Sequence, residues 1–399
     1  MSALLPVYER EMVLVKGKGA KLFDKEGNEY LDFAAGIAVN GLGYGDRKVL
    51  KAIREQAAKL IHTSNLFHTE PASELARRLV AVAFPSKVFF CNSGTEAWEG
   101  AMKFARRIGK EQGRTEYVCF ERAFHGRTMG SLSTTWNPKY REPFEPLVPG
   151  VRFLPWNDLA AVAEAVGPKT AAVMIEPVQG EGGIRPAEAK FLQGIAAICR
   201  ERGALLALDE VQSGLGRTGR MFAFQHAGVT PDILTLAKPL GGGLPMGAIL
   251  LREDLAPHIH VGDHGSTFGG NPVAAAAALA VMDRLTTPGF VEGIARKGAF
   301  LVRGLKGLKK KYPNLVAEVR GLGLMIGVEM KGEAAPVLKG LRERKILATK
   351  AGDKVLRLLP PLVITRAEIK TFLAGLDEVL NEQGGAAPPP LEPPLAPRE

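Results

Sequence analysis

The sequence predicts an α/β fold, with a large domain built on a mainly parallel sheet and a smaller α+β domain. The chain has 399 residues, which is long for a single small core. From about Ser73 to Ile249, helical patterns alternate with short apolar strands, as is typical of a parallel sheet covered by helices. Further on, the segment Val316 to Met330 has the pattern of a hairpin, which indicates the smaller domain.

The N-terminal region is expected to form a short meander of β-hairpins. Between Val13 and Phe33, polar and apolar residues alternate around Gly17, Gly19 and the turn-like segment 24–28. We therefore assign residues 1–59 to an N-terminal segment that packs with the smaller domain.

The large domain is assigned to residues 60–271, where apolar runs predict its strands. These strands are Lys87–Cys91, Glu116–Phe120, Ala171–Ile175, Ala204–Leu208, Ile233–Leu236 and Ala248–Leu251. Most of them end where polar or glycine residues begin. In an open α/β sheet, ligands bind at the carboxyl ends of the strands, so these ends are where functional residues are expected.

The smaller C-terminal domain is assigned to residues 272–383. It starts with an Ala-rich helix over Pro272–Leu285 and continues with a basic helix and the hairpin. Residues 384–399 are rich in proline and cannot build a core, so they are predicted to be a disordered tail.

The composition argues against several classes of protein. No apolar run approaches the ~20 residues of a membrane span, and the N-terminus does not look like a signal peptide, so a cytoplasmic protein is expected. The three cysteines lack CxxC spacing, which predicts reduced core thiols and no metal site. The net charge of +10 is dispersed. Its densest cluster, Lys309–Lys311, lacks interleaved aromatics and is interpreted as a solvated helix end, so nucleic acid is not an expected partner.

The clearest chemical signal is a pair of charged residues at two strand ends. Asp209 follows the apolar run Leu206–Leu208, and Lys238 stands between the run Ile233–Leu236 and the triple glycine Gly241–Gly243. A lysine there can form a Schiff base with an aldehyde cofactor, and the carboxylate can anchor a cationic ring nitrogen. The alternative is that Asp209 caps a helix and Lys238 reaches the surface.

A second signal is the strand, small-residue turn and helix over Phe89–Ala97. Backbone N–H groups at Ser93, Gly94 and Thr95 would lie at the helix start, where phosphate binds readily. The alternative is an ordinary helix cap. The segment matches neither GxGxxG nor the Walker loop, which argues against a dinucleotide or ATP enzyme.

Two further segments follow strand ends. Phe124–Thr128 offers an aromatic ring that can cover a planar cofactor and, at Arg127, a guanidinium that can bind a carboxylate. Glu176 and Glu181 place two carboxylates after another strand. Each segment alone could be surface structure, but all of these signals fall at strand ends of one predicted sheet.

Together these motifs resemble the class III pyridoxal-phosphate aminotransferases, and among them the acetylornithine aminotransferases. The resemblance extends from about Val13 to Leu380 and includes His264–Pro272. It implies a fold type I transferase whose large domain has a mainly parallel seven-stranded sheet. It also implies a homodimer whose active sites lie at the subunit interface.

Carried over by motif, the resemblance implies pyridoxal 5'-phosphate as the cofactor and two catalytic residues. Lys238 would form the imine with the cofactor and shuttle a proton, and Asp209 would keep the pyridine nitrogen protonated. The other residues implied to bind the cofactor are Ser93, Gly94, Thr95, Phe124, His125, Val211, Gln212 and Thr267 of the partner subunit.

The resemblance also implies how substrates bind, with Ser266 near them. Arg127 resembles the arginine that binds the carboxylate remote from the reacting carbon, and Arg357 the one that binds the α-carboxylate of 2-oxoglutarate. The amino donor has no carboxylate beside its reacting carbon. Glu181 is therefore expected to pair with Arg357 when the donor binds and to swing away when 2-oxoglutarate binds.

The identity of the amino donor is left with alternatives. The segment Ala35–Asn40 favours N-acetylornithine because it lacks the aromatic residue of ornithine δ-aminotransferases. The segment Thr128–Phe144 resembles enzymes that act on lysine or ornithine precursors held by an acidic amino-group carrier protein, which the positive charge would suit. Succinylated diaminopimelate precursors and 4-aminobutyrate stay open, and a non-catalytic binding protein of the same fold is the alternative of another class.

The sequence departs from the family in two places. Trp98 stands where the family usually has Asn, and Gly43–Arg47 replaces the usual Gly-His-x-His-Pro. Both are expected to lie outside the chemical core and to affect packing near the subunit interface.

Overall fold

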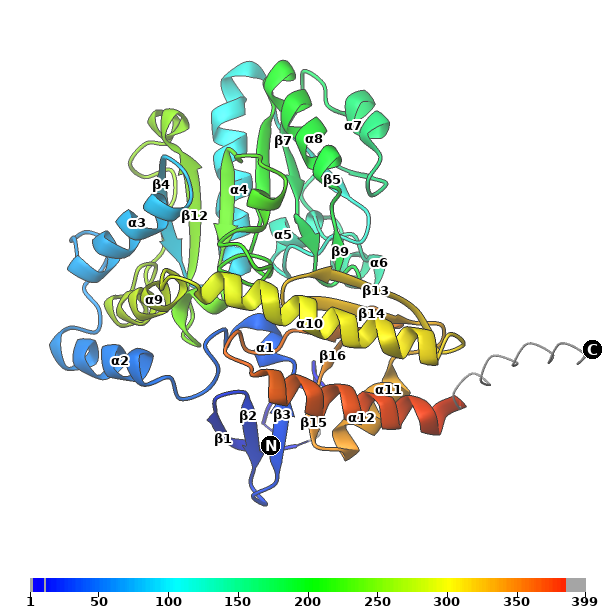
Figure 1. Ribbon diagram of the computed structural model, residues 1–399. Helices are drawn as coiled ribbons and strands as arrows, with labels where there is room; N and C mark the ends of the chain where they lie inside the picture. The colour runs from blue at the N-terminus through cyan, green and yellow to red at the C-terminus, as the bar shows by residue number, and fades with distance from the viewer. Residues whose placement is uncertain (1–2, 11, 385–399) are drawn as a thin grey trace, which may run out of the picture.

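A computed structural model describes residues 3–10 and 12–384 of the chain. In this part of the chain, a seven-stranded sheet is accompanied by two four-stranded sheets and a two-stranded ribbon. Figure 1 shows the large sheet in the upper half of the molecule, with the long helices α10 and α12 running across the lower half. The predicted fold class, with its mainly parallel seven-stranded sheet, is confirmed.

The large sheet contains every strand that the apolar runs predict. In spatial order, its strands are β4 (Ser86–Cys91), β12 (Gly247–Arg252), β11 (Ile233–Leu236), β10 (Leu205–Asp209), β7 (Thr170–Ile175), β5 (Glu116–Phe120) and β6 (Val151–Leu154). Only β12 runs antiparallel to its neighbours. The sequence reasoning missed β6, because this edge strand contains the exposed Arg152 and has no continuous apolar run.

Helices cover both faces of this sheet. On one face, α4 (Gly94–Gly109) covers a core that includes Met174, and on the other α8 (Ala189–Arg202) covers a core that includes Ile175. Because successive residues of a strand point to opposite faces, both faces of a strand such as β7 are buried. The helix α7 (Leu159–Ala165) packs beside α8.

The N-terminal meander is present as expected. Its strands are β1 (Leu14–Lys18), β2 (Lys21–Asp24) and β3 (Glu29–Asp32), and β15 (Ile346–Leu347) from the C-terminal part joins them by pairing in parallel with β3. The departure at Gly43–Arg47 has a local role, since Asp46 caps α2 (Arg47–Lys59) by accepting hydrogen bonds from the backbone N–H groups of Lys48 and Val49.

The C-terminal part forms a second, smaller sheet. Its strands, in order, are β13 (Val316–Leu322), β14 (Met325–Met330), β17 (Val355–Leu358) and β16 (Thr349–Ala351). The helices of this region are α10 (Phe290–Lys311), α11 (Ala335–Glu343) and α12 (Arg366–Gly384). Lys309–Lys311 form the end of α10, as predicted.

The Ala-rich helix α9 (Pro272–Leu285) packs against α2 and α3 (Glu70–Val82). The domain boundaries given above stay predictions, and most of the expected tail, residues 385–399, lies outside the described residues. The remaining short elements are α1 (Ala35–Ala38), α5 (Met129–Ser133), α6 (Pro138–Arg141), β8 (Val178–Gln179), β9 (Arg185–Pro186) and short stretches of 3-10 helix.

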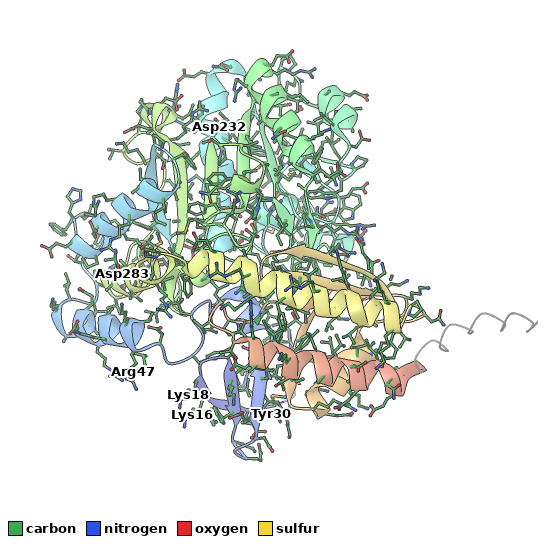
Figure 2. All side chains as sticks on the ribbon, in the orientation of Figure 1. Lys16, Lys18, Tyr30, Arg47, Asp232 and Asp283 are labelled. Carbon is green, nitrogen blue, oxygen red and sulfur yellow. The ribbon has the colours of Figure 1, made fainter. Side chains whose placement is uncertain are left out.

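The edge of the large sheet that faces the smaller sheet is the carboxyl edge. Asp232, labelled in Figure 2, lies just before the first residue of β11 at the far edge, while Tyr30 of the N-terminal meander lies at the opposite end of the molecule. Lys238 follows the other end of β11 and therefore faces the smaller sheet.

The cysteines of the described residues lie in the core. Cys91, Cys119 and Cys199 are free and buried, which confirms the expected core thiols. Within residues 3–10 and 12–384, no helix combines the length and apolar character needed to span a bilayer. The same part of the chain holds no group of three or more metal-binding side chains.

Candidate active site

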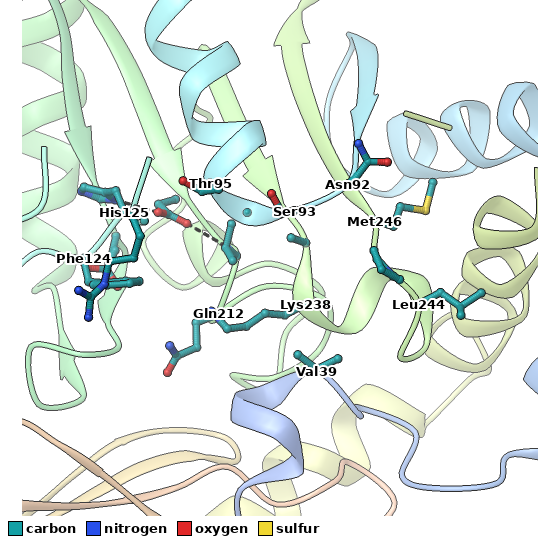
Figure 3. Close-up of a pocket in the computed structure, with 18 of the residues that line it drawn as sticks. Val39, Asn92, Ser93, Thr95, Phe124, His125, Gln212, Lys238, Leu244 and Met246 are labelled. Carbon is teal, nitrogen blue, oxygen red and sulfur yellow. Dashed lines mark hydrogen bonds and ion pairs between the residues drawn. The ribbon is translucent and has the colours of Figure 1, made fainter. Parts of the chain in front are cut away.

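A cavity of about 420 Å³ lies at the carboxyl edge of the large sheet. Figure 3 shows that its lining comes from the segments that follow several different strands, with Val39, the residue just after α1, on the opposite side. The cavity brings together nearly all of the residues predicted to bind the cofactor: Ser93, Gly94, Thr95, Phe124, His125, Asp209, Val211, Gln212 and Lys238. Arg127 also lines it.

Lys238 projects from the end of β11 into this cavity (Figure 3). Its φ of 36° lies in the left-handed region, which residues other than glycine rarely adopt. Desolvation lowers the pKa of the Lys238 amine, although the nearby carboxylates of Asp209 and Glu181 act in the opposite direction. A lowered pKa increases the fraction of neutral amine, which is the form that attacks an aldehyde.

Asp209 is held in place by two hydrogen bonds. Its Oδ2 lies 2.8 Å from Nδ1 of His125, and its Oδ1 accepts a hydrogen bond of 3.0 Å from the backbone N–H of Val211. The whole residue is buried. A carboxylate oriented in this way can face a protonated ring nitrogen in the cavity.

Trp98 supports this pair, contrary to the expectation that it lies outside the chemical core. Its ring stacks on His125 with centroids 4.0 Å apart and an interplanar angle of 13°. Its indole N–H donates to Oγ1 of Thr134 at 2.8 Å. Trp98 lies one turn into α4, on the helix face that packs on the sheet. Its indole is therefore fully buried below the loops that follow the strands.

The turn at the start of α4 fits the phosphate site that was predicted there. Ser93 is the N-cap and accepts a hydrogen bond of 3.2 Å from the backbone N–H of Glu96, so the helix-cap interpretation also holds. The first N–H groups of any helix lack partners within the helix. The loops pack so closely on this turn that glycine is required at two positions. A Cβ at Gly94 would lie 2.6 Å from Val211, and a Cβ at Gly126 would clash with Oγ1 of Thr95.

An unpaired buried atom provides a further test of the predicted cofactor. Oε1 of Gln212 is buried and has no hydrogen-bond partner within the described part of the chain. Buried polar atoms are usually paired, and a ligand hydroxyl that donates a hydrogen bond to this amide oxygen would satisfy it. The amine, the carboxylate, the helix start, the aromatic ring of Phe124 and this amide together fit pyridoxal phosphate.

The ion pair of Glu181 and Arg357 is formed in the structure. Nη1 of Arg357 donates to Oε1 of Glu181, and its Nε donates to Oγ1 of Thr349 at 3.1 Å. The Arg357 side chain is 2% exposed and that of Glu181 is 31% exposed. The arginine is therefore fixed in β17, while the carboxylate has room to move.

Glu176 has a role that the sequence reasoning did not assign. Its carboxylate accepts hydrogen bonds from the backbone N–H groups of Phe124 at 3.0 Å and Gly180 at 2.8 Å. Desolvation, together with the nearby charge of Asp209, raises its pKa. Glu176 thus fastens together the loop that carries Phe124 and the loop that carries Glu181.

Three predicted residues lie at or beyond the cavity rim. Thr267 is exposed and lines a separate hollow with residues from the segment 62–73. Ser266 accepts a hydrogen bond of 3.2 Å from Asn92 at the rim. The guanidinium of Arg127 lies 3.5 Å from the ring centroid of Tyr140, an aromatic partner that the sequence reasoning did not single out.

This fold and this arrangement of residues define a pyridoxal-phosphate-dependent aminotransferase. Residues 6–380 match the family described as Aminotransferase class-III, and the chain belongs to this family.

Individual relatives are similar over almost their whole length. The acetylornithine aminotransferase of Methanocaldococcus jannaschii is 48% identical over 384 residues, which is 95% of this chain and 96% of that protein. Among solved structures, the ornithine aminotransferase of Toxoplasma gondii has a TM-score of 0.92 at 32% identity, covering 96% of this chain and 93% of that one. The N-acetylornithine aminotransferase of Stenotrophomonas maltophilia has a TM-score of 0.83 at 37% identity, covering 94% and 97%.

Proposed function

We propose that this enzyme transfers the terminal amino group of N-acetyl-L-ornithine to 2-oxoglutarate, giving the semialdehyde and L-glutamate in arginine biosynthesis. The observation that carries the proposal is the 48% identity, over 95% of the chain, to an acetylornithine aminotransferase. The geometry of the site supports it, because Glu181 forms an ion pair with Arg357. This ion pair neutralises Arg357 when the bound donor has no carboxylate beside its reacting carbon.

Each substrate would use the two arginines differently. Arg127 at the cavity edge would bind the carboxylate remote from the reacting carbon, in both half-reactions. Arg357 would bind the α-carboxylate of 2-oxoglutarate or glutamate only after Glu181 leaves it. With the donor bound, Glu181 would neutralise Arg357, so that no charge is left unpaired in a buried place.

The reaction itself would depend on Lys238 and Asp209. When bound, pyridoxal phosphate supplies an electron sink for the substrate carbon that loses a proton. Nζ of Lys238 would take that proton and deliver it to the cofactor carbon that carries the aldehyde. Asp209, oriented by His125, would hold a proton on the ring nitrogen, and Phe124 and Val211 would enclose the two faces of the ring.

A homodimer in the cytoplasm is the assembly that we propose. Ile61, Leu66, Phe67 and Phe268 are large apolar residues exposed on the segments that surround Thr267. Association through this surface would bury them and would deliver Thr267 of the partner subunit to the phosphate.

A free small donor is favoured over one held by an acidic carrier protein. Among the described residues that line the cavity, Arg127 is the only cation apart from Lys238, so the cavity itself offers no extended basic surface. The comparison of amino donors described next includes a carrier-bound donor, whose preference would contradict the proposal.

Comparison of amino donors tests this proposal. Glutamate formation from 2-oxoglutarate is measured with the cofactor-loaded enzyme and N-acetylornithine, ornithine, 4-aminobutyrate, N-succinyldiaminopimelate or a carrier-bound lysine precursor. We expect the highest kcat/KM for N-acetylornithine and no activity for Lys238→Ala. A higher kcat/KM for the carrier-bound precursor would contradict the proposal.

A further inference from the structure

We propose that Arg320 is a positioning residue that holds the backbone of the Glu181 loop (residues 180–185) over Arg357. By doing so it sets the balance between the two half-reactions. This inference rests on the proposed function, in which Glu181 covers Arg357 for one substrate and leaves it for the other.

The register of the smaller sheet places both arginines on one face. Arg320 of β13 pairs with Gly327 of β14, and Gly327 pairs in turn with Arg357 of β17. Side chains of directly paired residues point to the same side of a sheet. Arg320 and Arg357 therefore stand in one row across three strands, with a glycine between them.

The Glu181 loop lies directly on this row. Arg320 donates from Nη2 to the carbonyl of Gly183 at 2.6 Å and from Nε to the same carbonyl at 2.9 Å. Its Nε also lies 3.1 Å from the carbonyl of Ile184. Glycine is needed beneath the loop, because a Cβ at Gly327 would come within 2.9 Å of Cβ of Ile184.

The loop is thus fastened on both sides of Glu181. On the N-terminal side, the backbone N–H of Gly180 donates to Glu176 at 2.8 Å. On the C-terminal side, Arg320 holds the carbonyls of Gly183 and Ile184. These bonds are made to the backbone, so the Glu181 side chain can rotate away from Arg357 and return to the same place.

Arg320 is itself kept rigid. Its Nη1 donates to Glu318 at 2.6 Å and to Glu329, and its side chain is only 9% exposed. Charged donors make stronger hydrogen bonds than neutral ones, so loss of this guanidinium would free the loop. Glu181 would then cover Arg357 less often, which favours the substrates that carry a carboxylate beside the reacting carbon.

The test compares the two half-reactions of the holoenzyme for Arg320→Met. Conversion of the cofactor is followed separately with L-glutamate and with N-acetylornithine. We expect the ratio of kcat/KM for glutamate over N-acetylornithine to rise about tenfold, the effect typical of losing a hydrogen bond from a charged donor. Arg320→Lys should give an intermediate ratio.

A second read-out does not depend on catalysis. Backbone amides of residues 181–185 should exchange hydrogen faster in Arg320→Met than in the wild type. The control is Glu318→Gln, which removes the charge of one partner of Arg320 and leaves its bonds to the loop carbonyls, so the ratio and the exchange should not change. Gly327→Ala, which pushes Ile184 away from the sheet, should shift the ratio in the same direction as Arg320→Met.

Equal losses in both half-reactions, with an unchanged ratio and unchanged exchange, would assign Arg320 a merely structural role and overturn the inference. A wild-type enzyme that reacts with glutamate but not with N-acetylornithine would contradict the proposed function instead. In that case a lowered KM for glutamate and faster exchange in Arg320→Met would still support the positioning role, and the absence of both would overturn it.

Discussion

At the scale of single residues, the site depends on side chains that hold other side chains. Asp209 is oriented by His125, and His125 is stacked on Trp98, which is anchored in turn by Thr134. Each of these contacts is buried, so each removes freedom from the carboxylate that faces the ring nitrogen. Trp98, where we expect the chain to depart from its family, lies behind the cavity and against His125.

Truncation of Trp98 should therefore affect both stability and cofactor binding. Trp98→Ala would leave a cavity and is expected to cost about 3–5 kcal/mol in the free energy of unfolding and to weaken cofactor binding. Trp98→Phe keeps a ring against His125 and loses the bond to Thr134, so a cost of about 1–2 kcal/mol is expected. Urea unfolding and titration with pyridoxal phosphate measure both effects, and wild-type behaviour of Trp98→Ala would contradict this role.

At the scale of helices and strands, packing in the smaller domain depends on close contact with α10. A Cβ at Gly298 would lie 2.0 Å from the carbonyl oxygen of Gly323, so α10 touches the β13–β14 turn directly. Gly307, in the same helix, has nothing within 4 Å of such a Cβ.

The two glycines should respond in opposite ways to alanine. Gly298→Ala would force α10 away from the turn and is expected to destabilise the protein by about 1–3 kcal/mol or more. Gly307→Ala should stabilise it by about 0.5–1 kcal/mol, because alanine loses less entropy in a helix. Thermal or urea unfolding of both variants checks the pair, and equal effects would refute the direct contact.

How well the sequence predicts a strand depends on how deeply that strand is buried. Strands buried on both faces, such as Ile233–Leu236, are continuous apolar runs and are found from sequence. The edge strand Val151–Leu154 is half exposed and carries Arg152, so its signal is weak. In the site, residues of known motifs are found, whereas the roles of Trp98, Glu176 and Arg320 depend on contacts between distant segments that no local pattern encodes.

At the scale of the whole molecule, stability should depend on pH through a lysine that ties α10 to the C-terminal part. Lys297 donates to the carbonyl of Leu362, and desolvation lowers its pKa from 10.5 to about 8. Between these values the unfolded chain binds more protons than the folded protein, so this lysine makes stability rise with pH. Below about pH 8, burial of the charged amine has its full cost.

Comparison with Lys297→Met isolates this contribution. Urea midpoints of both proteins are measured at about pH 7.5 and about pH 9.5, within the range where the linkage acts. The stability of the wild type relative to the variant should increase at the higher pH. A difference that stays constant or decreases would contradict the lowered pKa of Lys297.

The proposed assembly can be tested by mixing inactive subunits. Lys238→Ala lacks the reactive amine, and Thr267→Val lacks the hydroxyl that each subunit would lend to its partner. In a hybrid dimer one of the two sites would have both residues, so an equal mixture allowed to exchange should approach about a quarter of wild-type activity. Activity no greater than that of the separate variants would contradict a shared site.

The most direct test of the account is the donor half-reaction in isolation. N-acetylornithine is added to the cofactor-loaded protein without any oxo acid, and the absorption spectrum is followed until the cofactor reaches its amine form. We predict rapid and complete conversion, reversed by 2-oxoglutarate and absent in Lys238→Ala. If glutamate converts the cofactor but N-acetylornithine does not, the enzyme is still an aminotransferase and the proposed amino donor is wrong.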